Sequence, residues 1–255
     1  MPESAAVSPP HAAAPAEEKK DYVRALFCTV SQRYDLVNSL LSLLLDRCWR
    51  WRTVRLLRDF PAGSVLDLCA GTMPLSLELT RQAEKRTVLA IDFCEAMLRT
   101  GVSRLPDDGR RQRIFPVCGD SEDIPAPDNT FCACTVGFGV RNLARTGQGL
   151  AEMRRVLRPG GRLLILELSR PRNRLVRPLY HCYLHHLLPR IAGLCSGHRE
   201  AYEYLARSVA AFYEPEELLA MLRESGFRHV ERRKLSLGIV SIYIGHKPHS
   251  AEPTP

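Results

Sequence analysis

The chain has 255 residues, of which 45% are hydrophobic, so it can bury one good core and is short for two full domains. The net charge of +8 and the pI near 9.2 favour an anionic partner, which nucleic acid and lipid headgroups would both supply. No apolar run reaches the roughly eighteen residues that a transmembrane helix needs, which excludes a membrane span.

The two ends of the chain differ in composition from the rest. Residues 1–20 are rich in Ala and Pro and lack apolar periodicity, so we expect a disordered tail there and another over residues 248–255. The N-terminal segment has neither the Arg-rich, acid-poor composition of a transit peptide nor the apolar core of a secretory signal. Nine scattered cysteines without a CxxC pair indicate reduced thiols, and a cytoplasmic protein is predicted.

Helical periodicity dominates the next segment. Residues 21–60 predict an N-terminal helical cap, in which Leu36, Leu40, Leu43 and Leu44 share one face before the break at Pro61. Beyond it, β-rich and helical segments alternate, which predicts parallel strands with helices on both faces of the sheet. The strands are expected at residues 65–69, 87–91, 114–118, 131–136 and 162–168, and the helices between them at 75–83, 95–105 and 148–157.

The alternation stops after Leu168. We expect residues 170–213 to form a helical lid insertion, followed by a helix at 215–225 and by two antiparallel edge strands at 229–234 and 239–245. Residues 61–247 are therefore predicted to form an α/β domain with a doubly wound, mainly parallel, seven-stranded sheet.

Acidic residues end or follow the first three predicted strands, at the edge where open α/β sheets bind ligands. The first strand leads into a small-residue turn, where Asp67 and Gly71 suit the charged amino-acid part of a cofactor. Asp92 ends the second strand about twenty residues later and is placed to accept both hydroxyls of a ribose. Asp120, after the third strand, can accept a hydrogen bond from an adenine amino group, with the backbone N–H of Ser121 facing the ring.

Each of these acids has an ordinary structural alternative, because an Asp after a strand commonly caps the next helix. Three such acids in order favour a nucleotide-containing cofactor over chance capping. A nicotinamide dinucleotide is less well matched, since the first turn has the sequence AGTMPL in place of G-x-G-x-x-G.

Taken together, these motifs resemble the class I S-adenosylmethionine methyltransferases and, within them, the ubiquinone/menaquinone C-methyltransferases. The resemblance covers residues 27–247 and includes a turn at residues 157–162 that many methyltransferases share. It implies a Rossmann-like fold and transfer of a methyl group from S-adenosylmethionine to a carbon of a polyprenylated quinol, either demethylmenaquinol or a benzoquinol precursor of ubiquinone. The more specific motifs are Tyr34 and Asp35 with Asn38, Ser42 and Trp49, the FGVRN sequence at residues 138–142, and Tyr202, Tyr204, Leu205, Ser208 and Phe212.

The resemblance also implies site residues. Arg141 and Asn142, with Tyr34 nearby, would face the quinol. Methylating an aromatic carbon requires a ring oxygen to lose its proton as the carbon attacks the methyl group. Arg141 is too basic to take that proton itself, so our hypothesis is that it orients a water and stabilises the developing phenolate, the alternative being a salt bridge or a loop-fixing hydrogen bond. The residues implied to line the cofactor are Thr72, Asp92, Asp120, Ser121 and Gly137.

The first turn departs from the family pattern, because Met73 and Pro74 stand where a Gly and a polar residue are usual. A side chain at position 73 predicts either a shifted turn with weaker cofactor affinity or a protein that keeps the fold without efficient catalysis. A noncatalytic assembly protein of a quinone pathway and a methyltransferase with another small or RNA acceptor therefore remain as alternatives. The aromatic content of 7% disfavours an RNA acceptor.

Residues 170–199 combine arginines and histidines with apolar residues at helical spacing and contain no acid. Such a segment beside an active-site mouth could lie peripherally on an anionic inner-membrane face and admit a lipid tail, although an ordinary lid helix would show the same pattern. His181 and His185 are one turn apart but lack a third ligand, so no metal site is predicted. We expect a lipid-tailed quinol as partner and no nucleic acid, and a homodimer or a quinone-pathway complex stays open.

Overall fold

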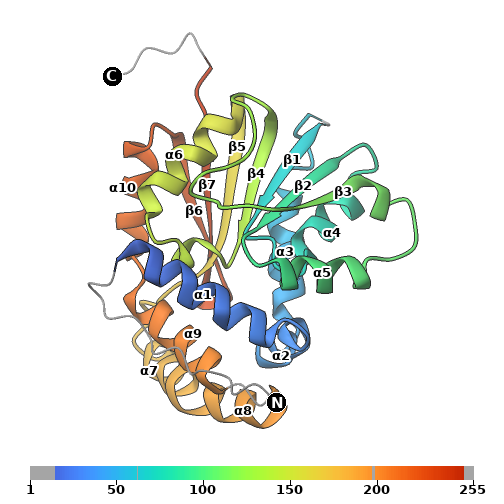
Figure 1. Ribbon diagram of the computed structural model, residues 1–255. Helices are drawn as coiled ribbons and strands as arrows, with labels where there is room; N and C mark the ends of the chain where they lie inside the picture. The colour runs from blue at the N-terminus through green and yellow to red at the C-terminus, as the bar shows by residue number, and fades with distance from the viewer. Residues whose placement is uncertain (1–14, 62, 197–198, 250–255) are drawn as a thin grey trace.

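A seven-stranded sheet in the order β3-β2-β1-β4-β5-β7-β6 organises the computed structural model, which describes residues 15–61, 63–196 and 199–249 (Figure 1). Neighbouring strands are parallel from β3 to β5, and β7 runs antiparallel to both β5 and β6. The predicted doubly wound α/β fold with an antiparallel hairpin at one edge is confirmed. The strands are β1 Ser64–Leu68, β2 Thr87–Asp92, β3 Ile114–Cys118, β4 Phe131–Gly137, β5 Leu157–Leu168, β6 Arg228–Leu235 and β7 Val240–His246.

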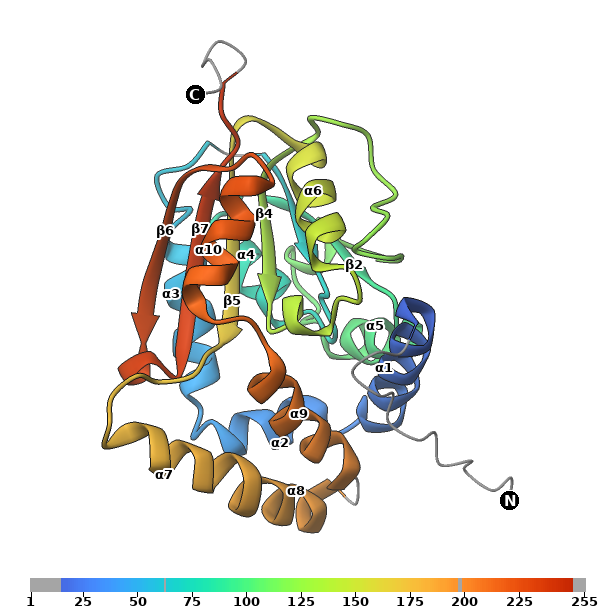
Figure 2. The same ribbon diagram turned by 90° about the vertical axis from the view of Figure 1, so that its left-hand side faces the viewer.

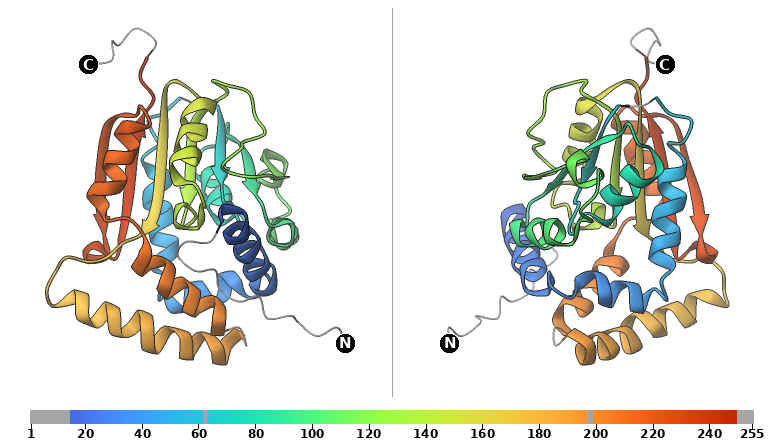
Figure 3. Two further views of the ribbon diagram at one scale, coloured as in Figure 1. Left: turned by 60° about the vertical axis from the view of Figure 1, so that its left-hand side comes forward. Right: turned by 90° about the vertical axis from the view of Figure 1, so that its right-hand side faces the viewer.

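Helices cover both faces of the sheet, and each face has its own apolar core (Figures 1 and 3). On one side lie α3 Leu45–Arg55, α4 Pro74–Gln82 and α5 Glu95–Arg104, whose buried side chains include Val54, Leu79 and Leu98. On the other lie α6 Thr146–Val156 and α10 Pro215–Glu224. Central strands covered on both faces need continuous apolar runs, which explains why β4 is buried along nearly its whole length.

The N-terminal cap consists of three helices, where the sequence suggested one continuous helical pattern. They are α1 Ala16–Val30, α2 Tyr34–Leu41 and α3, and the chain breaks between the last two at Leu43 and Leu44, which have φ values of 51° and 63°. Because α1 begins at Ala16, residues 16–20 are helical, and the tail expected there was too long. Contacts made by Lys19 and Lys20 anchor this first turn. The rest of the two predicted tails, residues 1–14 and 250–255, lies outside the described residues.

The segment expected to be a helical insertion holds α7 Val176–Cys182, a π-helical turn η3 Tyr183–Leu187, α8 Leu188–Ser196 and α9 Arg199–Ala211. These helices and α2 gather beyond the carboxyl ends of the parallel strands, where Figures 2 and 3 show them as a separate layer. A third apolar cluster, which includes Val37, Leu184 and Tyr202, holds that layer together. The layer therefore covers the carboxyl edge of the sheet, where a ligand was expected.

One predicted turn is part of a strand. Residues 157–162, expected as a turn before the fifth strand, belong to β5, whose Leu157 pairs with Phe131 of β4. A register shift between Phe131 and Ala133 accommodates the turn at Gly160, where φ is 75°. Because Leu157, before this turn, still pairs with β4, β5 begins five residues earlier than predicted. The other strand boundaries agree with the predictions to within one or two residues.

Candidate active site

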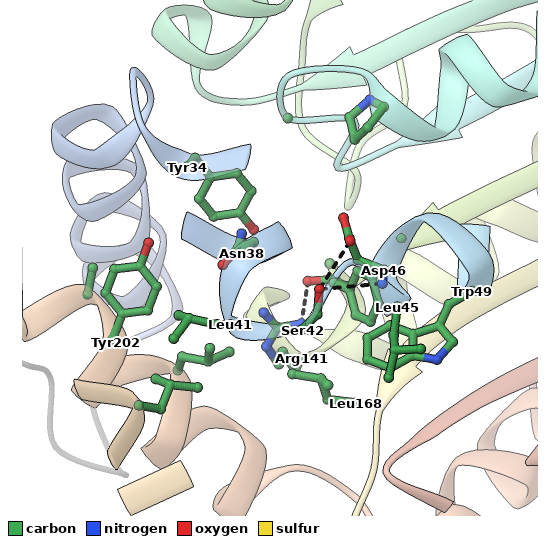
Figure 4. Close-up of a pocket in the computed structure, with 18 of the residues that line it drawn as sticks. Tyr34, Asn38, Leu41, Ser42, Leu45, Asp46, Trp49, Arg141, Leu168 and Tyr202 are labelled. Atoms are coloured by element: carbon green, nitrogen blue, oxygen red, sulfur yellow. Dashed lines mark hydrogen bonds between the residues drawn. The ribbon is translucent and has the colours of Figure 1, made fainter. Parts of the chain in front are cut away.

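A large cavity lies between the carboxyl ends of β1, β2 and β4 and the helices α2, α7, α8 and α9 (Figure 4). Its volume of about 880 Å³ lies within the range of roughly 300–1,000 Å³ that small-molecule sites occupy. One end is lined by strand-end turns and polar groups, among them Asp67, Cys69, Gly71, Thr72, Asp92 and Gly137. The other end is lined mainly by Leu40, Leu41, Leu45, Leu179, Leu184, Leu187, Leu188, Ile191 and Leu205.

Asp92 at the end of β2 is held rigidly at the polar end. Its Oδ2 accepts the backbone N–H of Gly71 at 2.8 Å, and its Oδ1 accepts the N–H of Cys94 at 2.9 Å. Burial raises the pKa of Asp92 to about 6, although both N–H donors act in the opposite direction. Each carboxylate oxygen keeps a further acceptor site, so the group can receive two hydroxyls without moving.

The turn after β1 places its backbone toward the cavity and one side chain away from it. Gly71 has a φ of 55°, which only glycine adopts without strain, and Thr72 Oγ1 donates to Asp35 Oδ1 at 2.5 Å. Met73 is left-handed as well, with φ 64°, and its side chain is fully buried in the core near Gly101. Because Met73 does not line the cavity, its side chain leaves the cofactor end open.

Asp67 makes its contacts inside the domain. Its Oδ2 accepts the Ser76 hydroxyl at 2.5 Å and its Oδ1 accepts the Thr135 hydroxyl at 2.8 Å. Burial raises the pKa of Asp67 to about 6 against the effect of these two donors. The carboxylate therefore links β1 to α4 and β4 at the cavity wall. A ligand could use only the lone pairs that these two hydrogen bonds leave free.

Asp120 and Ser121, which the sequence assigned to adenine, do not line the cavity. Lys20 of α1 reaches Asp120 Oδ2 at 2.6 Å and Glu122 Oε2 at 3.0 Å, so a cation already occupies one oxygen of Asp120. Ser121 is buried, and its hydroxyl lies 3.4 Å from the Cys69 thiol. The sequence placed both residues at the correct strand end but gave no sign that α1 crosses it.

Arg141, in the 3-10 turn η2 Val140–Asn142, forms a buried ion pair. Its Nη1 lies 2.6 Å from Glu167 Oε1, and the two side chains are 4% and 0% exposed. Glu167 Oε2 also accepts the Arg141 backbone N–H at 3.2 Å. Burial opposes the Arg141 charge, but Glu167 outweighs it and raises the pKa of Arg141. The guanidinium therefore stays protonated, which rules it out as a direct base.

Tyrosine hydroxyls and an amide surround this arginine. Tyr204 of α9 donates to Asn142 Oδ1 at 3.1 Å, which fixes the amide that follows Arg141. Figure 4 shows Tyr34 with its hydroxyl close to Asn38, and burial raises the pKa of Tyr34 while the Asn38 hydrogen bond lowers it. The same view shows Ser42 bonded to Asp46, which closes the wall beside them.

Comparison with known proteins gives the chain its family. It matches the model of the ubiE/COQ5 methyltransferase family over residues 15–247. The chain belongs to the ubiE/COQ5 methyltransferase family. Among its relatives, the ubiquinone/menaquinone biosynthesis C-methyltransferase UbiE of Geobacter sulfurreducens is 41% identical over 231 residues, 90% of each chain. The demethylmenaquinone methyltransferase of Mycobacterium bovis is also 41% identical over 231 residues, 91% of this chain and 94% of the relative.

Solved structures place this ubiE/COQ5 family member in a wider fold group. An S-adenosylmethionine-dependent methyltransferase from Aquifex aeolicus superposes with a TM-score of 0.57 at 20% identity, covering 82% of this chain and 97% of the other. At that identity the likeness shows the fold alone. It agrees with the α/β fold of this chain.

Most residues predicted for this family's site come together in the structure. The exceptions are Asp120 and Ser121, as described above. The cavity described above is lined by the others, namely Tyr34, Asp67, Gly71, Thr72, Asp92, Gly137, Arg141 and Asn142.

Sequence reasoning missed two residues around Arg141, namely Glu167 and Tyr180. The available signal for Glu167 was one acid at the end of the otherwise apolar segment LLILEL, because a buried charge needs a partner. Tyr180 falls within residues 170–199, whose apolar helical pattern does not distinguish a ligand-binding tyrosine from a packed one. Within residues 15–61, 63–196 and 199–249, no three His, Cys, Asp or Glu side chains are grouped to hold a metal ion. No helix in that part of the chain is long and apolar enough to cross a bilayer.

Proposed function

We propose that this ubiE/COQ5 family member transfers the methyl group of S-adenosylmethionine to a ring carbon of a polyprenylated quinol. The observation that carries the proposal is one continuous cavity with carboxylates at one end, leucines at the other and a buried arginine between them. The polar end suits a nucleotide with a charged amino-acid part, and the apolar end suits a lipid tail. The names of the relatives, quinone C-methyltransferases, agree with that assignment.

Residues of the polar end fit the proposed cofactor. The fixed acceptors of Asp92 match the two hydroxyls of a ribose, while Thr72 and Gly137 line the space next to them. When bound, S-adenosylmethionine would supply an electrophilic methyl group on a sulfonium centre. Asp120 lies outside the cavity lining, and both of its oxygens have partners, Lys20 at Oδ2 and the N–H of Glu122 at Oδ1, so its assigned role toward adenine requires Lys20 to move away.

Arg141 would act on the acceptor. Its protonated guanidinium, held by Glu167 and by the carbonyl of Phe138, presents a fixed positive charge to the cavity. That charge stabilises a phenolate as the ring oxygen loses its proton, and Arg141 can orient the water that receives the proton. Asn142 and Tyr34 complete the polar rim around the ring.

The test is Arg141→Ala, which removes the guanidinium and leaves the polar end unchanged. Cofactor affinity by calorimetry should stay within a factor of about two, while turnover of a demethylated quinol falls by about 10²–10³. Arg199→Ala is the control, because Arg199 is exposed and forms a surface ion pair with Glu203 on its own helix. Equal loss of affinity and turnover in Arg141→Ala would contradict the assignment, and so would unchanged turnover.

We also propose that the mouth of the cavity lies on an anionic membrane surface. Leucines from two distant segments are exposed there: Leu43 is 80% exposed in the α2–α3 break, and Leu175 and Leu179 are 78% and 73% exposed around α7. Leu43 and Leu179 line the cavity as well. Arg174 and Arg177 are exposed beside the second group, which adds attraction to anionic headgroups. A lipid-tailed quinol could then enter the cavity directly from the bilayer.

Liposome sedimentation tests this surface. The protein should bind vesicles with anionic lipid more strongly than zwitterionic ones, and Leu43→Ser with Leu179→Ser should weaken binding to both. Phe115→Ser is the matched control, because Phe115 is also exposed but lies in β3 at the far edge of the sheet. Equal binding by the leucine variant and the control would refute the membrane surface.

A further inference from the structure

At the cavity, the Nε of Arg141 and the hydroxyl of Tyr180 are buried donors without a hydrogen-bond partner among the residues that the structure describes. Buried polar atoms are nearly always paired, so each exception calls for an explanation. Both residues line the cavity. Unpaired donors that face a cavity indicate acceptors on the molecule that fills it.

Two neighbouring tyrosines at the cavity use their hydroxyls in bonds within the protein. Tyr183, one turn further along the same helical segment, donates to the carbonyl of Leu41 at 2.6 Å. Tyr204 donates to Asn142 at 3.1 Å. Both hydroxyls therefore serve the protein's own structure, whereas the Tyr180 hydroxyl serves no described group.

Tyr180 of α7 and Arg141 of η2 line the same cavity. Burial raises the pKa of Tyr180, and the charge of Arg141 acts on it in the opposite direction, which requires the two groups to be close. At neutral pH the phenol therefore keeps its proton and can donate it in a hydrogen bond to an acceptor on the ligand. A protonated guanidinium and a protonated phenol form a pair of donors at the junction of the polar and apolar ends.

We propose that Tyr180 is a substrate-binding residue that recognises the second ring oxygen of the quinol. Arg141 faces the oxygen next to the carbon that is methylated, and Tyr180 donates a hydrogen bond to the oxygen across the ring. The inference rests on the proposed function and adds a specificity to it. The site then selects rings with two oxygens over monophenols, because a monophenol leaves the Tyr180 donor unpaired.

The experiment compares two acceptors. One is the demethylated quinol, and the other is an analogue that keeps the hydroxyl beside the methylated carbon and carries hydrogen in place of the other hydroxyl. For the intact protein, kcat/KM on the analogue should be at least about tenfold lower. Tyr180→Phe should lower kcat/KM about tenfold on the quinol and leave it nearly unchanged on the analogue, with cofactor affinity by calorimetry unaltered.

Tyr183→Phe is the matched control, because it also removes one hydroxyl but breaks a bond within the protein. It should leave the ratio of kcat/KM between the two acceptors as in the intact protein. If Tyr180→Phe lowers both acceptors equally, or leaves the quinol unaffected, the inference is wrong while the proposed function stands. If the intact protein fails to methylate the quinol at all, the proposed function and this inference fall together.

Discussion

Removal of Glu167 should show how much the buried ion pair with Arg141 contributes to the stability of the protein. The Arg141 side chain is 4% exposed in the intact protein, and Glu167→Ala removes the carboxylate at 2.6 Å that balances its charge. A buried charge stripped of its partner costs about 3–5 kcal/mol of folding free energy. The exposed pair between Arg199 and Glu203 has the same chemistry, with side chains 67% and 39% exposed, so Glu203→Ala should cost less than about 1 kcal/mol.

Urea unfolding measures the difference. With a slope of about 3 kcal/mol per molar urea, a loss of about 4 kcal/mol moves the midpoint down by roughly 1.3 M, against less than about 0.3 M for Glu203→Ala. The double variant Arg141→Met with Glu167→Leu removes both charges and should regain most of the lost stability, although not the activity. The reasoning is refuted if Glu167→Ala unfolds at the same urea concentration as Glu203→Ala, or if the double variant is the least stable of the three.

Three further outcomes follow from the geometry. Affinity for S-adenosylmethionine should fall by up to about tenfold per pH unit as pH drops through about 6, because the raised pKa of Asp92 lets it take up a proton in that range; calorimetry should show a flatter profile for Asp92→Asn and an unchanged one for Glu203→Gln, whose exposed side chain lies outside the cavity lining. Gly139→Ala should cost about 1–3 kcal/mol in thermal unfolding, since its added Cβ would lie 2.3 Å from Cys69, whereas Gly147→Ala has nothing within 4 Å and should be neutral or stabilising. Met73→Gly should lose about 2–5 kcal/mol of buried side chain and regain about 1–2 kcal/mol of backbone strain, for a net loss of stability with unchanged cofactor affinity.

The pH prediction has a definite sign in stability as well. Asp92 has a folded-state pKa near 6, above the value of about 3.9 expected when unfolded, so the folded state binds the proton more tightly. The penalty for its buried charge is therefore absent below about pH 4 and complete above pH 6. Stability and cofactor binding respond to this carboxylate in opposite directions, which is the usual cost of a charged group in a binding site.

Local patterns predicted the sheet well, because strand and helix periodicity depend on neighbours within a few residues. The strands around Asp92 and the turn at Gly71 lie where the alternation placed them. Patterns predicted the N-terminal region less well. The pattern placed Leu36 and Leu43 on one helical face, but they are 71% and 80% exposed, and Leu43 lies in the break after α2.

The amino-acid sequence by itself determined the order of strands and helices and the polar residues at the strand ends, since these follow from periodicity and turn chemistry along the chain. Only the tertiary structure decided which of those residues share a cavity. The crossing of α1 that gives Lys20 to Asp120, the burial of Met73 away from the cavity, and the pairing of Arg141 with Glu167 all join residues far apart in sequence or depend on how packed elements orient a side chain. Such contacts are fixed by how whole helices and strands pack, which no local pattern records.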